Sequence, residues 1–280
     1  MRVLQISVLA CIAAVGVAPS AMAPSAAGAA APKVHCGQTI RTNIRLTRDL
    51  RYCPGDGLVV GANNITINLD GHTLLGSGKR GTAGVRVTGF HGANVKSGVI
   101  RHFGRGVWLV TAVDSRIVDN TVRNSFDEGI FASKRSSRTI ILRNRVSGSG
   151  ESTGATFADG VDARGNGTRV RGNIVRESRD DGIDVNGDDD VVKRNTVVGS
   201  GQDGVDVDGF RTLVEGNLSI GNGDDGIGVG LHGGQVTIND NTADYNFDLG
   251  IQPKRGTADG AGNKAEGNGD PRQCVVVECS

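Results

Sequence analysis

Short pairs of apolar residues, separated by Gly, Asn and Asp, recur along this chain at a fixed interval. Each clear copy begins with Asp-Gly and an aliphatic residue, continues with one polar or small residue, and ends with a second apolar residue. Its apolar positions therefore alternate as in a strand. Because the copies leave no interval long enough for a helix, the period predicts a solenoid of stacked short strands. The clear copies are 22 residues apart and have Gly160, Gly182, Gly204 and Gly226, with weaker copies at Gly84, Gly106, Gly129 and Gly250.

A column of asparagines keeps the same phase, each 13 to 15 residues after the glycine of its copy. Asn tolerates the left-handed backbone of a sharp bend, and its side-chain amide can bond to the Asn of the next turn. We therefore expect these residues to line one corner of the stack. The column contains Asn120, Asn144, Asn173, Asn195, Asn217, Asn241 and Asn263.

These two columns resemble the repeats of right-handed parallel β-helix proteins of the pectin-lyase-like class, over roughly Gly57 to Lys264. The resemblance implies an all-β domain of about nine coils, in which stacking buries a continuous core that one turn could not bury alone. It implies no single activity, because such repeats occur in lyases, hydrolases, epimerases, adhesins and proteins of unknown role.

The first 31 residues are predicted to be a signal peptide and processing segment. Arg2 gives a positive start, Val3–Val17 is apolar, and small residues at Ala21 and Ala23 fit a cleavage site, as do those from Ala26 to Ala31. No other apolar stretch is long enough to span a bilayer. The sequence therefore predicts a secreted or periplasmic protein.

The domain is expected to span residues 32–280, with an N-terminal cap at 32–56 and a C-terminal cap at 266–280. Its four cysteines predict two disulfides in an exported protein, and three pairings are possible. We favour Cys36–Cys53 and Cys274–Cys279, because each pair lies at one end of the solenoid, where an exposed coil needs capping. Free thiols or a metal site are disfavoured, since no Cys-x-x-Cys motif occurs.

The charge balance does not favour a nucleic-acid partner. The formal net charge is +1, and no run of Lys and Arg suggests a polybasic patch. The 44 glycines are expected to serve the tight bends of the coils. The chain is expected to be a monomer.

The residue between the two apolar members of each copy is expected to point outward, so these residues form a column about 4.8 Å apart. Along it a Trp and a Phe lie beside three aspartates on what we expect to be an exposed face. Ring faces stack on sugar C–H groups, and carboxylates accept hydroxyl hydrogen bonds, so this face predicts a polysaccharide partner. The expected substrate-binding residues are Trp108, Phe131, Asp162 and Arg164.

Two carboxylates could cleave a glycosidic bond as acid and base, and the expected catalytic residues are Asp159, Asp181, Asp184 and Asp206. Asp159 and the pair Asp180-Asp181 resemble the first two acidic motifs of polygalacturonase-like hydrolases. The next coil has Gln202-Asp203-Gly204 where that family has Gly-His-Gly, and His232 follows one coil later. Hydrolase and lyase chemistry both stay open.

Three like charges at rung spacing repel one another, so a bound cation, raised pKa values or nearby basic groups must relieve them. Oxygen-only ligands suit Ca²⁺, with Asp184 and Asp206 as its expected ligands. A purely structural Asp ladder in a non-enzymatic solenoid is the alternative. The insertion between Ser147 and Ala158 is either a loop of the binding face or a loop without a role.

Overall fold

The computed structural model describes residues 33–150, 158–230 and 233–280. The predicted signal segment, most of the insertion between Ser147 and Ala158, and His232 lie outside these residues. Val34–Ser280 form one compact unit, which we call the coil domain. The described residues contain strands and no helix, and therefore no helix long and apolar enough to cross a bilayer.

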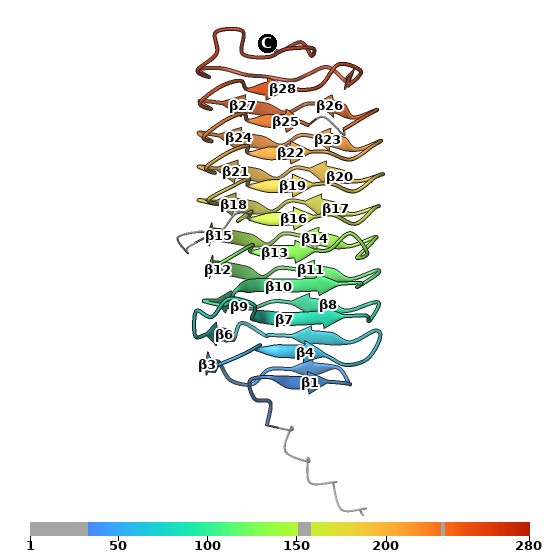
Figure 1. The fold of residues 1–280 in the computed structure, drawn as a ribbon, viewed down its shortest axis with the longest axis vertical. Helices are drawn as coiled ribbons and strands as arrows, with labels where there is room; N and C mark the ends of the chain where they lie inside the picture. Colours follow the sequence, from blue (N-terminus) through green and yellow to red (C-terminus); the bar gives the residue numbers. More distant parts are fainter. Residues whose placement is uncertain (1–32, 151–157, 231–232) are drawn as a thin grey trace, which may run out of the picture. The chain divides into compact units, whose positions relative to one another are not determined.

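Each coil contributes one short strand to each of three parallel sheets (Figure 1). Sheets A and B have ten strands and sheet C has nine, so nine coils are complete and a tenth supplies two strands. The predicted fold, an all-β right-handed parallel β-helix of about nine coils, is confirmed.

The strands follow the order A, B, C along the chain. Sheet A contains β1 (Gln38–Ile40), β4 (Leu58–Val60), β7 (Ala83–Thr88), β10 (Arg105–Val110), β13 (Ile130–Ala132), β16 (Val161–Ala163), β19 (Ile183–Val185), β22 (Val205–Val207), β25 (Ile227–Val229) and β28 (Ile251–Gln252). Sheet B contains β2 (Ile44–Arg45), β5 (Thr66–Asn68), β8 (Asn94–Lys96), β11 (Arg116–Val118), β14 (Ile140–Leu142), β17 (Arg169–Arg171), β20 (Val191–Lys193), β23 (Leu213–Glu215), β26 (Thr237–Asn239) and β29 (Ala258–Asp259). Sheet C contains β3 (Leu50–Cys53), β6 (Thr73–Gly76), β9 (Val99–Arg101), β12 (Thr121–Ser125), β15 (Arg145–Ser149), β18 (Ile174–Arg176), β21 (Thr196–Val198), β24 (Leu218–Ile220) and β27 (Thr242–Asp244).

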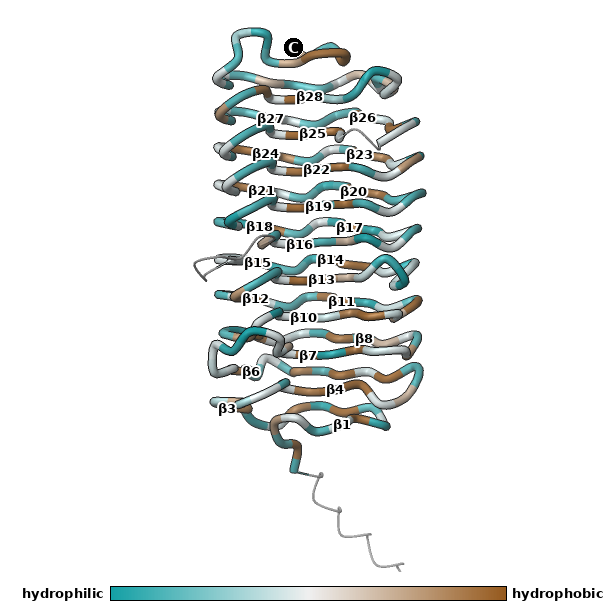
Figure 2. Tube along the Cα trace, viewed as in Figure 1, coloured by the Kyte–Doolittle hydropathy of each residue, from teal (hydrophilic) through white to brown (hydrophobic). Residues whose placement is uncertain are grey.

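Aliphatic side chains from all three sheets fill the interior, and apolar segments recur from coil to coil (Figure 2). In the coil of β19, Ile183 and Val185 of sheet A, Val192 of sheet B and Val197 of sheet C are all fully buried. The predicted alternation in sheet A is thus confirmed, since the two aliphatic residues face the core and the residue between them faces out.

The buried asparagines form a continuous ladder at the corner between sheets B and C. The Asn195 side-chain oxygen accepts hydrogen bonds from the backbone N–H (2.9 Å) and the amide (3.0 Å) of Asn173, and the Asn195 amide donates to Asn217 (3.0 Å). The predicted amide contact between turns is confirmed. The predicted left-handed backbone is wrong by one position, because Arg194, directly before Asn195, has the positive φ of 54°.

The glycines that define the period are required by close packing, although bends were expected to require them. A Cβ on Gly182 would lie 2.1 Å from Val197 Cγ1 and 2.6 Å from the Gly204 carbonyl oxygen, while the φ of Gly182 is not positive. Each coil approaches the next too closely at this column for any side chain to fit.

Both ends of the coil domain carry a disulfide, as predicted: Cys36–Cys53 and Cys274–Cys279. Each bond ties the chain next to a terminal coil, where the sheet edges lack a neighbouring strand. Disulfides persist in oxidising environments and are rare in the cytosol, so both bonds are consistent with an extracellular or periplasmic location.

Candidate functional site

The outward positions of sheet A form one column, as predicted, and we call the surface along it the A face. Parallel pairing sets Trp108 opposite Phe131, Phe131 opposite Asp162, and Asp162 opposite Asp184. Asp184 then pairs with Asp206. The three aspartates therefore lie one rung apart, directly beyond the two aromatic residues.

The column is less exposed than the sequence predicts. Asp162 is fully buried, while Asp184 and Asp206 are half-buried. Arg164 covers Asp162 and donates from Nη2 to Oδ2 (2.6 Å) and from Nε to Oδ1 (2.9 Å). The expected exposure is thus wrong for Asp162, because a neighbouring arginine on the same strand end binds it.

The two aromatic rings are also covered, by arginine side chains. The Arg86 and Arg105 guanidinium carbons lie 4.0 and 4.3 Å from the centre of the Trp108 ring. Arg105 and Arg164 contact the Phe131 ring at 4.9 and 5.2 Å. Both rings are half-buried in a cation–π stack. The expectation of open ring faces is wrong, since guanidinium groups already occupy positions that a sugar would need.

A second acidic column lies three residues before the first and contains Asp159, Asp181, Asp203 and Asp225. The carboxylates of Asp159, Asp181 and Asp203 accept hydrogen bonds from the backbone N–H of the next member at 3.1, 2.8 and 2.9 Å. Asp225 accepts from the Leu249 N–H at 2.9 Å. This column therefore supports the stacking of coils.

Burial raises the pKa of the aspartates in both columns, and neighbouring carboxylates raise it further. The pKa is raised to about 10 at Asp159 and about 9 at Asp181. It is raised to about 8 at Asp184, where Asp162 and Asp206 add to the effect of burial. At Asp162 burial raises the pKa to about 6 against the opposing hydrogen bond from Arg164. At neutral pH Asp159, Asp181 and Asp184 therefore hold protons.

The raised values continue along the next coils. Burial raises the pKa of Asp203 to about 8, of Asp225 to about 7 and of Asp206 to about 6. Neighbouring carboxylates contribute at each of these positions as well. Aspartates with raised pKa values are therefore found on several successive coils and not on one coil alone.

Three groups of carboxylates bring ligand atoms within 4.8 Å of one another. The first joins Asp159, Asp162 and Asp184, and we call it the central cluster. Its donors are oxygen only, and Ca²⁺ takes oxygens at about 2.3–2.6 Å, so this spacing fits one ion. The other two groups are Asp159, Asp180 and Asp181, and Asp203, Asp224 and Asp225.

The predicted site residues are only partly brought together. Asp184 belongs to the central cluster, while Asp206 belongs to none of the three clusters found among the described residues. Of the predicted catalytic groups, Asp159 is almost fully buried, and Asp184 and Asp206 are more accessible.

The sequence interpretation missed Asp180, Asp203, Asp224 and Asp225 as possible metal ligands. The signal was present, because an acidic residue precedes the glycine in each of these copies at the 22-residue period. That interpretation considered as metal ligands only the residues at the outward strand position and not those in the bend before each strand.

Comparison with known proteins supports the fold. Residues 159–280 match a family model described as a right-handed beta helix region. No curated protein matches the chain in sequence.

Three solved structures illustrate the similarity. The Dettilon tailspike protein is 15% identical with a TM-score of 0.60, covering 85% of this chain and 56% of its own. The periplasmic alginate epimerase AlgG is 14% identical with a TM-score of 0.54, and the match covers 81% of this chain and 51% of the epimerase chain. Pectate lyase Pel9A is 15% identical with a TM-score of 0.52, and the match covers 79% of this chain and 73% of the lyase chain. The chain thus spans only about half the length of the tailspike and epimerase chains. Together with the family model, these similarities identify its fold as a right-handed parallel β-helix.

Proposed function

We propose that this protein binds an acidic polysaccharide of the uronate type along the A face, with Ca²⁺ held by the central cluster. The observation that carries the proposal is the convergence of Asp159, Asp162 and Asp184. Arg164 is hydrogen-bonded to this cluster through Asp162. A divalent cation would replace the protons that Asp159 and Asp184 hold, balance the charge of the resulting carboxylates and leave coordination positions for carboxylates of the polymer.

The similar structures support this choice of ligand. Two of them are named for alginate and pectate, both of which are polymers of sugar acids. At such low identity the fold is shared, but the functional residues cannot be transferred. The proposal for this chain therefore depends on its own carboxylates.

Cleavage is the extension of this proposal. Asp184 and Asp206 are the half-buried aspartates of the outward column, and a group with a raised pKa such as Asp184 can donate a proton near neutral pH. Arg164 lies beside them on the same face and could contact the polymer acid group. Both hydrolysis and elimination would use these residues.

The test is calorimetric titration of Ca²⁺, and then of an oligogalacturonate in Ca²⁺, into wild type and Asp184→Asn. We expect the variant to lose at least about tenfold in Ca²⁺ affinity, since it replaces a charged ligand by a neutral one. Asp189→Asn is the matched control, because Asp189 lies in the same coil but is exposed and paired with Arg211 (2.7 Å). An absence of Ca²⁺ binding to wild type would refute the proposal. Product analysis after incubation with the polymer tests cleavage separately.

A non-enzymatic structural solenoid is the second candidate. The observation favouring it is that each carboxylate of the Asp159 column already accepts a backbone N–H from the next coil. On this alternative, Asp184→Asn would relieve repulsion, leave ligand binding undetectable and raise the melting temperature.

We also propose that residues 1–31 are removed on export and that residues 32–56 and 266–280 cap a monomeric coil domain. The disulfide at each end supports the caps. Intact mass of the purified protein, before and after reduction, gives both the cleavage site and the number of disulfides. Sedimentation gives the oligomeric state.

A further inference from the structure

Four exposed arginines lie on four successive coils of sheet C, and we call the surface they share the C face. They are Arg101 in β9, Arg123 in β12, Arg145 in β15 and Arg176 in β18. Arg101 pairs with Arg123 in register. On the following coil Ser147 pairs with both Arg123 and Arg176, and Arg145 lies two residues before Ser147 on the same strand. With rungs about 4.8 Å apart, the guanidinium groups follow the direction of stacking.

The positive charge of these four side chains is not neutralised. None of them makes an ion pair or a side-chain hydrogen bond within the described ranges. Other arginines of the coils differ: Arg138 binds Asp114 (2.7 Å) and Arg143 binds Asp119 (2.8 Å). The arginines of the C face are therefore available to an external anion.

The C face is hollowed at two adjacent places. A cavity of about 250 Å³ is lined by Arg123, Arg145 and Arg176, together with Ser147. None of the described residues that line it is acidic. The cavity offers three planar guanidinium groups, whose fork geometry matches a carboxylate.

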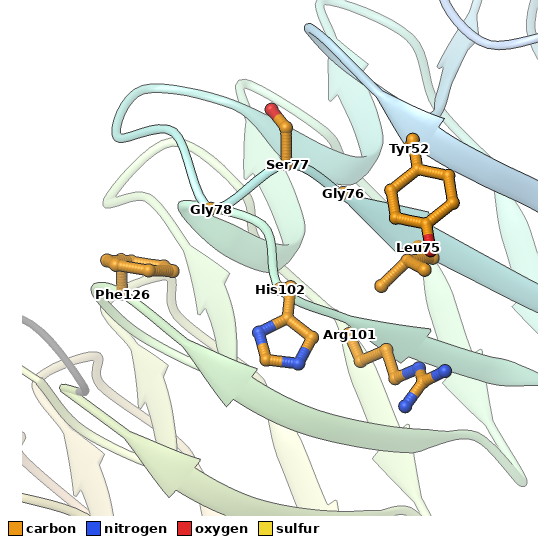
Figure 3. A pocket seen from close by; sticks show the side chains of 8 residues that line it. All are labelled: Tyr52, Leu75, Gly76, Ser77, Gly78, Arg101, His102 and Phe126. Carbon is orange, nitrogen blue, oxygen red and sulfur yellow. The ribbon is translucent and has the colours of Figure 1, made fainter.

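A larger hollow of about 430 Å³ begins at Arg101, one rung before Arg123. In Figure 3 the rings of Tyr52 and Phe126 lie on opposite sides of this hollow, with His102 between them. Tyr52 is 76% exposed, which is unusual for an aromatic residue and leaves its ring open to a ligand. Aromatic rings of this kind pack against the C–H faces of sugars.

We propose that the C face binds an acidic polysaccharide as an extended chain that follows the stacked coils. Its acid groups contact the four arginines, and one sugar ring enters the hollow between Tyr52 and Phe126. Single-stranded nucleic acid fits less well, because such sites present aromatic side chains to successive bases, whereas the aromatics here lie at one end only. The site is separate from the A face and needs no Ca²⁺.

The test measures binding of an oligogalacturonate in EDTA, which removes any contribution from a Ca²⁺ site. The variant combines Arg123→Gln, Arg145→Gln and Arg176→Gln. The control combines Arg116→Gln, Arg169→Gln and Arg171→Gln, which are exposed arginines of sheet B. Both variants lose the same charge, so a difference between them reports position and not net charge.

We expect the C-face variant to bind about tenfold more weakly at low salt, and the control to bind like wild type. Binding by wild type should weaken as salt is added, since exposed charges are screened. Equal losses in both variants, or no binding in EDTA, would overturn the proposal. Tighter binding of a single-stranded DNA oligomer, lost in the same variant, would overturn the choice of polysaccharide. Because Asp184→Asn acts only on Ca²⁺-dependent binding, failure of one site is distinguishable from failure of the other.

Discussion

At the scale of single residues, the aspartates of the A face combine two roles that the sequence does not separate. Asp159 accepts a backbone N–H from the next coil and also belongs to the central cluster. Its burial and its acidic neighbours raise its pKa to about 10, so it is protonated at neutral pH. Binding a cation there must therefore release a proton.

Ca²⁺ affinity is expected to increase as pH rises from about 6 to about 9, because Asp184, with a pKa of about 8, loses its proton in that range. Calorimetry at one pH in buffers of different ionisation enthalpy should show proton release on binding. The pH dependence should be weaker in Asp184→Asn, which has no proton to lose at that position. An affinity independent of pH would contradict the assignment of the central cluster.

At the scale of elements, the asparagine ladder and the glycine column set how closely coils stack. Each asparagine is buried, and from Asn144 on its side-chain oxygen accepts the backbone N–H of the preceding asparagine, as Asn195 does for Asn173 and Asn217 does for Asn195. Buried polar groups lose free energy when a partner is removed, since they can no longer reach water. The ladder is thus a place where one side chain affects two coils.

Asn195→Ala is expected to lower the free energy of unfolding by about 1–3 kcal/mol, because it leaves the Asn173 backbone N–H without its acceptor. Asn166→Ala is the control, since Asn166 is exposed and lies outside the ladder. Urea denaturation of both variants measures the difference. Equal stabilities would show that the ladder does not hold the coils together.

Much at this scale was predictable from sequence, and what was missed has physical causes. The period fixed the strand register, so Asp162, Asp184 and Asp206 align as predicted. Burial of Asp162 and coverage of Trp108 were not predictable, because they depend on where the long arginine side chains bend. The C-face arginines were missed because they lie 22, 22 and 31 residues apart and form no run.

At the scale of the whole coil domain, the opposed placement of charge is the main electrostatic feature. The formal net charge is only +1, yet sheet A gathers acidic residues, and sheet C gathers arginines that have no ion-pair partner among the described residues. The A face gains negative charge only as these carboxyl groups lose protons, which begins for Asp184 near pH 8, whereas the arginines of the C face stay positive. A polymer and its counterions would therefore meet different charges on the two faces.

Thermal stability without Ca²⁺ is expected to fall as pH rises from about 5 to 9. The aspartates have pKa values raised to between about 6 and about 10 in the folded state, at Asp162, Asp184, Asp181 and Asp159, against about 3.9 when unfolded. The folded state thus holds more protons than the unfolded state across this range. The stabilisation from these protons is fully present below the unfolded pKa and is lost as pH rises through the folded pKa of each aspartate.

Melting curves in EDTA at several pH values test this expectation, and Ca²⁺ should restore stability most at the alkaline end by neutralising the carboxylates. A melting temperature that increases with pH in EDTA would contradict the pKa assignments. Asp189→Asn should leave the trend unchanged, because its carboxylate is exposed and paired.

The glycine at position 228 has a consequence for how far such a stack can be extended. Every additional coil of this sequence type adds a strand to each of the three sheets and also a carboxyl group to the same line, so repulsion between ionised members increases with length. Three aspartates follow one another in that line, and then Gly228 and Gln252 take the place of a fourth and a fifth. The interruption lets the solenoid continue beyond Asp206 while this line of carboxyl groups ends, so the number of coils is not limited by repulsion along the line.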